Sequence, residues 1–216
     1  MTALPATLRR WARPLRRRWR PTVVERRIAA LDLRRGDVAI DCGANVGDVT
    51  DLFAGRGAFV HAFEPNPAAF NVLAERFGDD PNVSLHQRAV LDRPGTARLY
   101  LHVDAVDDPV GASVGTSVLE DKGNVDSERY LDVDAVDLAE FVLALDEPVR
   151  VLKLDVEGAE CPIVHRLLDT GAIDRIETVF VELHDRHIPA LKLENERLRE
   201  RLAREQLTEK VLTDWI

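Results

Sequence analysis

Short apolar runs alternate with amphipathic stretches along this chain. Residues 38–42, 58–63, 83–90, 149–155 and 178–184 are apolar runs of strand length. The stretches between them place apolar side chains at helical spacing. Strands that are apolar on both faces and are joined by helices form parallel sheets covered on both sides. The pattern therefore predicts an α/β fold with a doubly wound, mostly parallel, Rossmann-like sheet.

Helix boundaries are marked at two places. Asn66 and Pro67 are typical of an N-cap followed by a first-turn proline, and Gly78 is typical of a helix end. Asp137 and Glu140 have the spacing of a capping box. These signals predict one helix between Pro67 and Gly78 and another that begins after Asp137.

The middle of the chain departs from this alternation. Residues 96–103 alternate in polarity and predict an additional strand, and residues 129–133 are expected to pair with it or run beside it. Between them lie residues 104–126, which are long for a connection within a compact domain. We therefore expect an inserted strand pair that carries a lid, a binding loop or a disordered segment.

The last predicted helix carries a narrow apolar stripe of Leu191, Leu198 and Leu202, together with Asn195. Two heptads are too few to predict a coiled coil, so we expect this helix to cover the sheet. An oligomer contact through the same helix is the alternative. Residues 210–216 predict a short strand at the sheet edge.

Composition is that of a globular domain with a substantial core. The 216 residues are 45% hydrophobic and 31% charged, and no apolar run approaches the roughly 18 residues of a membrane span. Cys42 and Cys161 lie far apart and outside any metal or redox motif. We expect a reducing, cytoplasmic setting.

The net charge of -9 hides two regions of opposite sign. Residues 1–27 contain nine arginines and one acid, whereas the other 189 residues contain 20 basic and 37 acidic side chains. Trp11 and Trp19 lie among the arginines, which suits the headgroup layer of a membrane. A solvated leader that packs on the acidic body is an equally good interpretation, and the acidic body disfavours nucleic acid. We divide the chain into a basic leader (1–27), a body (28–187) and a C-terminal segment (188–216).

Ligands of such sheets bind at the carboxyl ends of the strands, near the reversal of strand order. The first strand ends in a G-x-N-x-G turn that contains Gly43, Asn45 and Gly47 and follows Asp41 directly. Small residues let a ligand approach the backbone, but the turn departs from the dinucleotide fingerprint G-x-G-x-x-G, and Asp41 disfavours a pyrophosphate. A tight strand-to-helix turn that needs small residues is the alternative.

Glu64 ends the second strand, where a carboxylate can accept hydrogen bonds from both ribose hydroxyls of an adenosine. With the turn, it predicts an adenosine ligand with a cationic extension, which S-adenosylmethionine fits. The predicted cofactor-binding set is completed by Asn66, which follows Glu64 closely, and by Ala89, at the end of the third predicted strand.

Four motifs follow one another at residues 40–47, 63–67, 153–160 and 181–184, and the K-x-D-V-E-G-A-E string of the third is the most specific. In this order they resemble the motifs of the FkbM family of S-adenosylmethionine-dependent methyltransferases, over about residues 38–184. The resemblance implies a class I methyltransferase fold and O-methylation of hydroxyls on sugars, polyketides or related metabolites. It also implies that the cofactor is bound by Asp41, Gly43, Asn45, Gly47 and Glu64.

Methyl transfer to a hydroxyl needs alignment of the reactants and a base. Asp155, Glu157, Glu160, Glu182 and His184 all lie at strand ends or just after them. Helix-start dipoles keep Glu157 and Glu160 ionised, so neutral His184 or Asp155 is the predicted base, with Glu157 as a third catalytic candidate. Helix-start electrostatics for the two glutamates, and an ordinary surface histidine, are the alternatives.

Asp155, Glu182 and His184 could gather a divalent metal, because hard oxygen and nitrogen ligands allow it, but their spacing matches no ligand motif, so the sequence leaves a metal possible and unsupported and assigns no metal ligands. Lys153 lies in a strand buried on both faces and must have a partner.

The acceptor is expected to be a small molecule or glycan that carries hydroxyls. Residues around 182–187 and the polar side chains of the 104–126 loop would bind it, namely Ser113, Ser117, Lys122 and Asn124. The alternative function is a non-catalytic adenosine-ligand-binding or interaction module that uses the basic leader and the C-terminal helix.

Overall fold

The structure is a computed structural model. It describes residues 23–102, 110, 111, 113, 116, 117, 125–184 and 191–213. The predictions for the leader up to residue 22, for Lys122 and Asn124, and for residues 185–190 and 214–216 lie outside the described residues.

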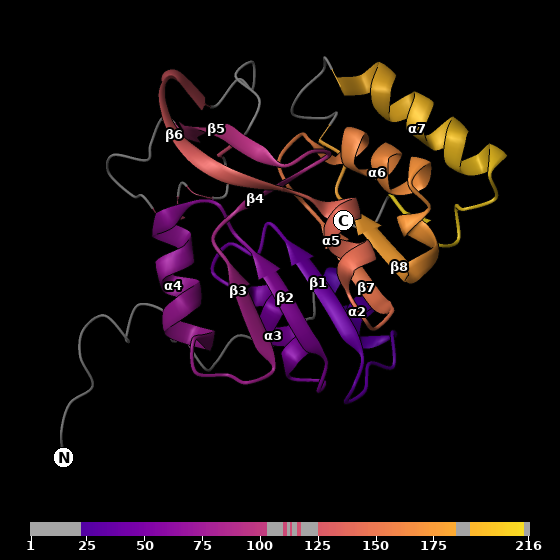
Figure 1. Cartoon of the computed structure of the whole chain (residues 1–216), viewed down its shortest axis with the longest axis horizontal. Helices are drawn as coiled ribbons and strands as arrows, with labels where there is room; N and C mark the ends of the chain where they lie inside the picture. Colours follow the sequence, from indigo (N-terminus) through magenta and orange to yellow (C-terminus); the bar gives the residue numbers. More distant parts are fainter. Residues whose placement is uncertain are drawn as a thin grey trace.

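A six-stranded sheet forms the centre of the molecule (Figure 1). Its order is β3 (Val83–His86), β2 (Phe59–Phe63), β1 (Val38–Cys42), β7 (Val149–Leu154), β8 (Ile176–Val181) and β9 (Val211–Leu212). All of its neighbouring strands are parallel. This is the Rossmann order, which reverses direction between β1 and β7. The predicted doubly wound α/β fold is confirmed.

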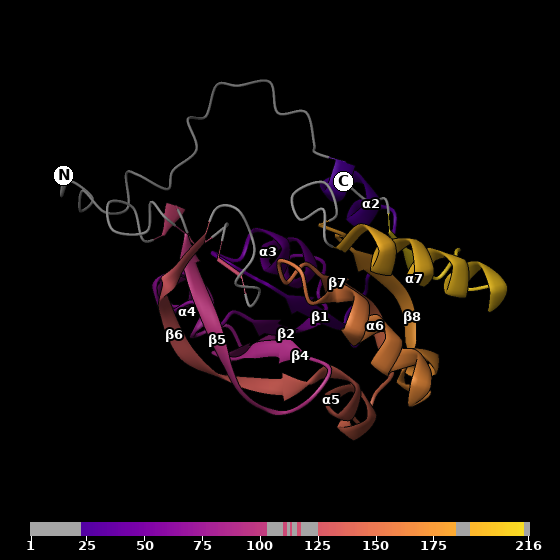
Figure 2. The same cartoon turned by 90° about the horizontal axis from the view of Figure 1, so that it is seen from above.

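Helices cover both faces of this sheet (Figure 2). One face carries α2 (Val23–Ala29), α3 (Asp48–Ala54) and α4 (Pro67–Phe77), and the other carries α5 (Leu138–Ala144) and α6 (Glu160–Asp169), with η3 (Ala172–Arg175) between α6 and β8. The strands supply both cores because successive side chains point to opposite faces. In β1, Ala39 belongs to the first core, and Ile40 belongs to the second.

The predicted helix starts are confirmed. The Asn66 side chain accepts a hydrogen bond from the backbone N–H of Ala68, and Gly78 ends α4. The Asp137 side chain accepts from the backbone N–H groups of Ala139 and Glu140 at the start of α5. In both cases the carboxylate or amide oxygen satisfies N–H groups that the helix itself leaves unpaired.

The inserted strand pair belongs to a second sheet of order β4 (Ala89–Leu91), β6 (Val125–Asp137) and β5 (Gly95–His102). β5 and β6 pair with each other, as predicted, and the pairing is antiparallel. The single strand predicted over residues 83–90 is wrong, because its two halves lie in different sheets. The chain turns at Arg88, whose N–H donates to the carbonyl of His86, so β3 stays in the main sheet and β4 joins β6.

The C-terminal helix α7 (Lys192–Arg204) packs its stripe on α6. Leu198 and Leu202 are buried in the same core as α6, and the Cys161 thiol lies 2.8 Å from Oδ1 of Asn195. The stripe is therefore covered within this chain. The predicted strand after it is present at Val211–Leu212 and runs parallel to β8 at the sheet edge.

The boundary expected between leader and body falls inside a helix. α2 begins at Val23, and its Ile28 is fully buried in the core beside α3. Among the described residues, no helix combines the length and the apolar character that a bilayer crossing requires.

Candidate active site

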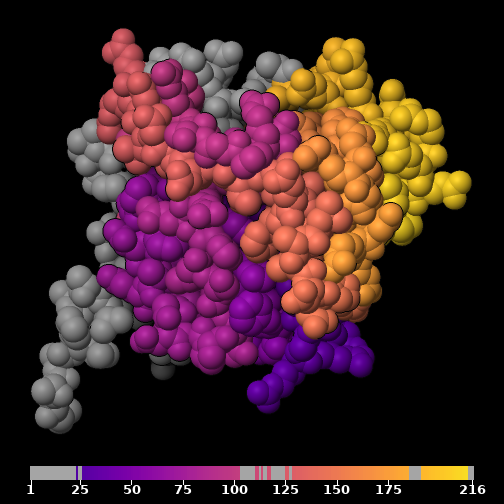
Figure 3. Space-filling model, viewed as in Figure 1, coloured from indigo at the N-terminus to yellow at the C-terminus, as the bar shows by residue number. Residues whose placement is uncertain are grey.

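A cavity of about 300 Å³ lies where the loops after β1 and β7 meet, at the reversal of strand order. Residues 43–46, 48, 49 and 63–65 form one side, and residues 153, 155–157 and 182 form the other. Residues 88–90, 99, 113 and 116 complete the wall. The space-filling view shows the purple N-terminal half and the orange C-terminal half side by side, with the β5–β6 arm above them (Figure 3).

Gly43 brings the two loops together. Its φ is +76°, and a Cβ at this position would lie 1.8 Å from the carbonyl oxygen of Asp155. Gly47 has a different reason to be glycine, because a Cβ there would lie 2.5 Å from the ring of Phe77 and 2.6 Å from Leu73. Only Gly43 lines the cavity. Gly47 packs against α4 in this structure, and the cofactor contact expected of Gly47 stays a prediction.

Glu64 faces the cavity from the end of β2 and is only 5% exposed. One of its oxygens accepts the backbone N–H of Asn45 at 2.8 Å, and the other accepts that of Asn66 at 2.7 Å. Burial raises the pKa of Glu64 to about 7, although these two hydrogen bonds act in the opposite direction. Each carboxylate oxygen can still accept a further hydrogen bond.

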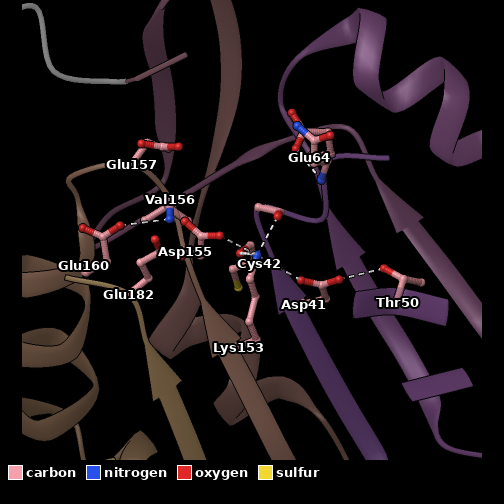
Figure 4. Close-up of polar contacts among 12 residues, drawn as sticks. Asp41, Cys42, Thr50, Glu64, Lys153, Asp155, Val156, Glu157, Glu160 and Glu182 are labelled. Carbon is pink, nitrogen blue, oxygen red and sulfur yellow. Dashed lines mark hydrogen bonds and ion pairs between the residues drawn. The ribbon is translucent and has the colours of Figure 1, made fainter. Parts of the chain in front are cut away.

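Asp41 lies behind the cavity wall (Figure 4). It is fully buried, its Oδ2 accepts the hydroxyl of Thr50 at 2.8 Å, and its Oδ1 lies 3.4 Å from Nζ of Lys153. Asp41 and Lys153 are register partners on β1 and β7, so their side chains point to the same face. In this structure Asp41 holds Lys153, and the cofactor contact expected of Asp41 stays a prediction.

Lys153 connects the two walls, and its predicted need for a partner is confirmed. Its Nζ donates to the carbonyl of Gly43 at 2.7 Å and lies 3.1 Å from Oδ2 of Asp155. Burial lowers the pKa of Lys153, but the charges of Asp155 and Asp41 outweigh burial, so the pKa is raised. The sequence predicted that Lys153 is buried and paired but did not identify its partners. It also gave no indication that Thr50 binds Asp41.

Of the remaining predicted cofactor residues, two line the cavity and one does not. Asn45 and Ala89 line the cavity, and the side-chain amide of Asn45 donates to the hydroxyl of Ser113 at 2.9 Å. Asn66 does not line it, because its side chain caps α4. Arg88, Val90, Leu99 and Thr116 line it without having been predicted.

The other end of the cavity is acidic. Asp155, Glu157 and Glu182 line it, whereas Glu160 is buried beneath it. The Glu160 carboxylate accepts the backbone N–H groups of Val156 and Gly158 at 3.0–3.1 Å. Helix-start electrostatics therefore accounts for Glu160, whereas Glu157 lines the cavity.

His184 lies against this acidic group and is 5% exposed. Its Nε2 is 3.2 Å from Glu157, 3.6 Å from Asp155 and 3.9 Å from Glu182. Burial lowers the pKa of His184, but contact with Glu160 and the nearby charges outweigh burial and raise it to about 9. The raised pKa favours the protonated imidazole, whereas a base must be neutral, and the catalytic role of His184 stays a prediction.

Glu182, like Glu64, is a carboxyl group whose pKa is raised. Burial, followed by the charge of Asp155, raises its pKa to about 7. The sequence placed Glu182 among the candidate bases but favoured Asp155 and His184. The reason is that burial and neighbouring charges are set by contacts between strands, which sequence spacing does not show.

The described part of the 104–126 loop bridges both walls. Ser113 accepts the amide of Asn45, and the Ser117 hydroxyl donates to the carbonyl of Glu157 at 2.6 Å. Of the serines expected to meet the acceptor, Ser113 lines the cavity, and Ser117 holds the Glu157 turn.

The Rossmann strand order, the cavity at its switch point and the acid at the end of β2 define a class I, Rossmann-like methyltransferase fold. The model of the methyltransferase FkbM domain matches residues 41–209. The chain belongs to this family of S-adenosylmethionine-dependent methyltransferases.

Three relatives illustrate the range of the similarity. The chain is 30% identical over 179 residues to the 31-O-demethyl-FK506 methyltransferase FkbM of Streptomyces tacrolimicus, covering 72% of this chain and 68% of the relative. It is 27% identical over 158 residues to the hexuronic acid methyltransferase AglP of Haloferax volcanii, covering 73% and 60%. A third match, to the ribosomal RNA small subunit methyltransferase H of Novosphingobium aromaticivorans, is 37% identical over 71 residues, covering 32% and 22%. The chain thus spans less than two thirds of two of these relatives.

Proposed function

We propose that this chain transfers the methyl group of S-adenosylmethionine to a hydroxyl of a sugar, a glycan, a polyketide or a related metabolite. The observation that carries the proposal is one cavity with Glu64 at one end and three carboxylates at the other. The names of two relatives, a hexuronic acid methyltransferase and a 31-O-demethyl-FK506 methyltransferase, support hydroxylated acceptors.

The adenosine would lie beside Glu64, whose carboxylate oxygens accept the ribose hydroxyls in addition to the two backbone N–H groups. The close approach at Gly43 leaves the turn after β1 open to the ligand. When bound, S-adenosylmethionine supplies an electrophilic methyl group on a cationic sulfur. The acidic end of the cavity favours a cation of this kind.

The acceptor hydroxyl would lie at the acidic end, where Asp155, Glu157 and Glu182 reach the cavity. Asp155 is suited to accept the hydroxyl proton, because Lys153 holds Oδ2 and leaves Oδ1 toward the acidic group. The chain's main contribution is to hold the hydroxyl in line with the methyl group, since orientation supplies a large part of such rate enhancements.

The test has two stages. Isothermal titration with S-adenosylhomocysteine is expected to show one site per chain, and Glu64→Ala is expected to weaken binding at least tenfold, whereas Glu209→Gln on the exposed surface is not. Radiolabelled S-adenosylmethionine is then incubated with hydroxylated glycan and polyketide extracts. Label in an alkali-stable ether supports O-methylation, and an Asp155→Asn variant is expected to lose at least 90% of it.

Two results would contradict the proposal in different ways. If the parent chain does not bind S-adenosylhomocysteine, the cofactor assignment is wrong. Binding without transfer to any hydroxylated acceptor would instead favour the non-catalytic adenosine-binding module.

A further inference from the structure

The acidic end of the cavity contains a histidine in an unusual setting. Three carboxylates from the ends of two neighbouring strands surround one ring nitrogen of His184, with Nε2–oxygen distances of 3.2, 3.6 and 3.9 Å. Asp155, Glu157 and His184 each offer one ligand atom, and these atoms lie within 4.8 Å of one another. Ligands at about 2.1 Å from one octahedral ion lie about 3.0 Å apart when adjacent and about 4.2 Å apart when opposite. The three side chains therefore have nearly the separation that one cation requires.

The second ring nitrogen provides an independent observation. Nδ1 of His184 is buried and lies 3.0 Å from Oε1 of Glu160, yet among the described residues it has no hydrogen-bond partner of acceptable geometry. Glu160 is itself held by the backbone N–H groups of Val156 and Gly158. A histidine that ligates a metal through one nitrogen usually donates its other N–H to such a carboxylate. Glu160 lies in the position that such a carboxylate would occupy.

The charges of the surrounding groups agree with a cation. Lys153 takes Oδ2 of Asp155 at 3.1 Å, so Oδ1 is the oxygen directed at the histidine. Glu157 and Glu182 add two further carboxylates to the wall. With Lys153 committed to Asp155 and Asp41, the carboxylates that face His184 outnumber the cations beside them.

We propose that Asp155, Glu157 and His184 form a binding site for a divalent cation of the Mn²⁺ type. Carboxylate oxygens and one imidazole nitrogen are ligands that Mn²⁺ accepts together. The site is at the cavity wall, so an ion there keeps open positions for an acceptor oxygen. That role for the ion rests on the proposed function, whereas the binding of the ion does not.

The experiment measures Mn²⁺ binding to the full chain directly. Free Mn²⁺ gives a six-line electron paramagnetic resonance signal that is lost on binding, so the signal is titrated against protein after treatment with a chelator. We expect one saturable site per chain in the unmodified protein. Glu157→Gln and His184→Gln are each expected to weaken it at least tenfold.

Glu209→Gln is the matched control, because it removes an exposed carboxylate away from the cavity. Each variant is compared with the parent in circular dichroism and melting temperature, and Glu157→Gln tests the proposal if His184→Gln fails to fold, because the Glu157 side chain is partly exposed. The absence of saturable binding in the parent would overturn the proposal, as would equal binding by the parent and Glu157→Gln. His184 would then serve only to neutralise the acids around it.

S-adenosylhomocysteine binding, measured on the same sample, separates this inference from the proposed function. If S-adenosylhomocysteine binds but Mn²⁺ does not, the metal site is wrong and the methyltransferase proposal stands. If Mn²⁺ binds but S-adenosylhomocysteine does not, the metal site stands without that function.

Discussion

Glu64 combines two tasks on one carboxylate. It already accepts the N–H groups of Asn45 and Asn66, and burial raises its pKa to about 7. The ionised form is the better acceptor for ribose hydroxyls, so the bound adenosine would favour deprotonation. Adenosine affinity should therefore rise with pH through the neutral range.

We predict that affinity for 5′-methylthioadenosine rises severalfold between pH 6 and pH 8, measured by isothermal titration. This probe carries the adenosine without the titrating amino group of S-adenosylmethionine. The stability of the free protein should change in the opposite direction. Because the pKa of Glu64 is higher in the folded chain than in the unfolded one, this group's contribution to the free energy of unfolding decreases as pH rises from about 4.5 to about 7. Glu64→Gln should bind at least tenfold more weakly and without this pH dependence. An affinity that is constant over this range in the parent would contradict the assignment.

Two features favour glycine at position 43, namely its positive φ and its close contact with the Asp155 carbonyl, and their effects on stability can be measured separately. Both Gly43 and Gly171 have a positive φ, but only Gly43 would place a Cβ against another atom, the carbonyl oxygen of Asp155. We predict that Gly43→Ala lowers the free energy of unfolding by about 2–4 kcal/mol. Gly171→Ala should cost only about 1 kcal/mol, because nothing lies within 4 Å of its added Cβ. Equal costs in urea denaturation would show that the contact with the β7 loop is unimportant.

At the scale of elements, α7 is part of the core and not a free helix. Leu198 is fully buried against α6, whereas Leu193, on the same helix, is 55% exposed. Leu198→Ala should therefore lower the free energy of unfolding by about 2–4 kcal/mol, and Leu193→Ala should change it by no more than about 0.5 kcal/mol. Thermal and urea unfolding measure both.

If Leu198→Ala left stability unchanged but altered the sedimentation of the chain, the leucine stripe would be a contact between chains. Such a result would support the oligomer that the sequence offered as an alternative. The present packing of Leu198 and Leu202 within one chain favours the first interpretation.

For the whole molecule, the separation of charge gives a prediction that does not depend on the active site. Residues 1–22 contain seven arginines and both Trp11 and Trp19. We predict that the full chain floats with vesicles that contain anionic lipid, and that a chain starting at Val23, where α2 begins, does not. The contact should weaken at high salt. Neutral vesicles are the control, and equal flotation of both chains would contradict the membrane interpretation.

The sequence by itself determined the local features of this protein. The positions of β1, β2, β7 and β8, the N-caps Asn66 and Asp137, and Glu64 at the end of β2 all follow from hydrophobic spacing, capping residues and strand ends. These signals are local, since each depends on residues only a few positions apart. The motifs that resemble the FkbM family are of the same kind, and the family is confirmed.

The tertiary structure alone decided which polar groups face the cavity. Asp41 and Glu64 both end strands, but Asp41 points toward Thr50 and Lys153, whereas Glu64 lines the cavity. Likewise, the Glu160 carboxylate accepts a backbone N–H group, whereas Glu157 and Glu182 line the cavity. The protonation of His184 depends on carboxylates that follow two different strands. The direction of a side chain and the charge around it are set by pairing between distant strands, and a pattern along one chain does not contain that pairing.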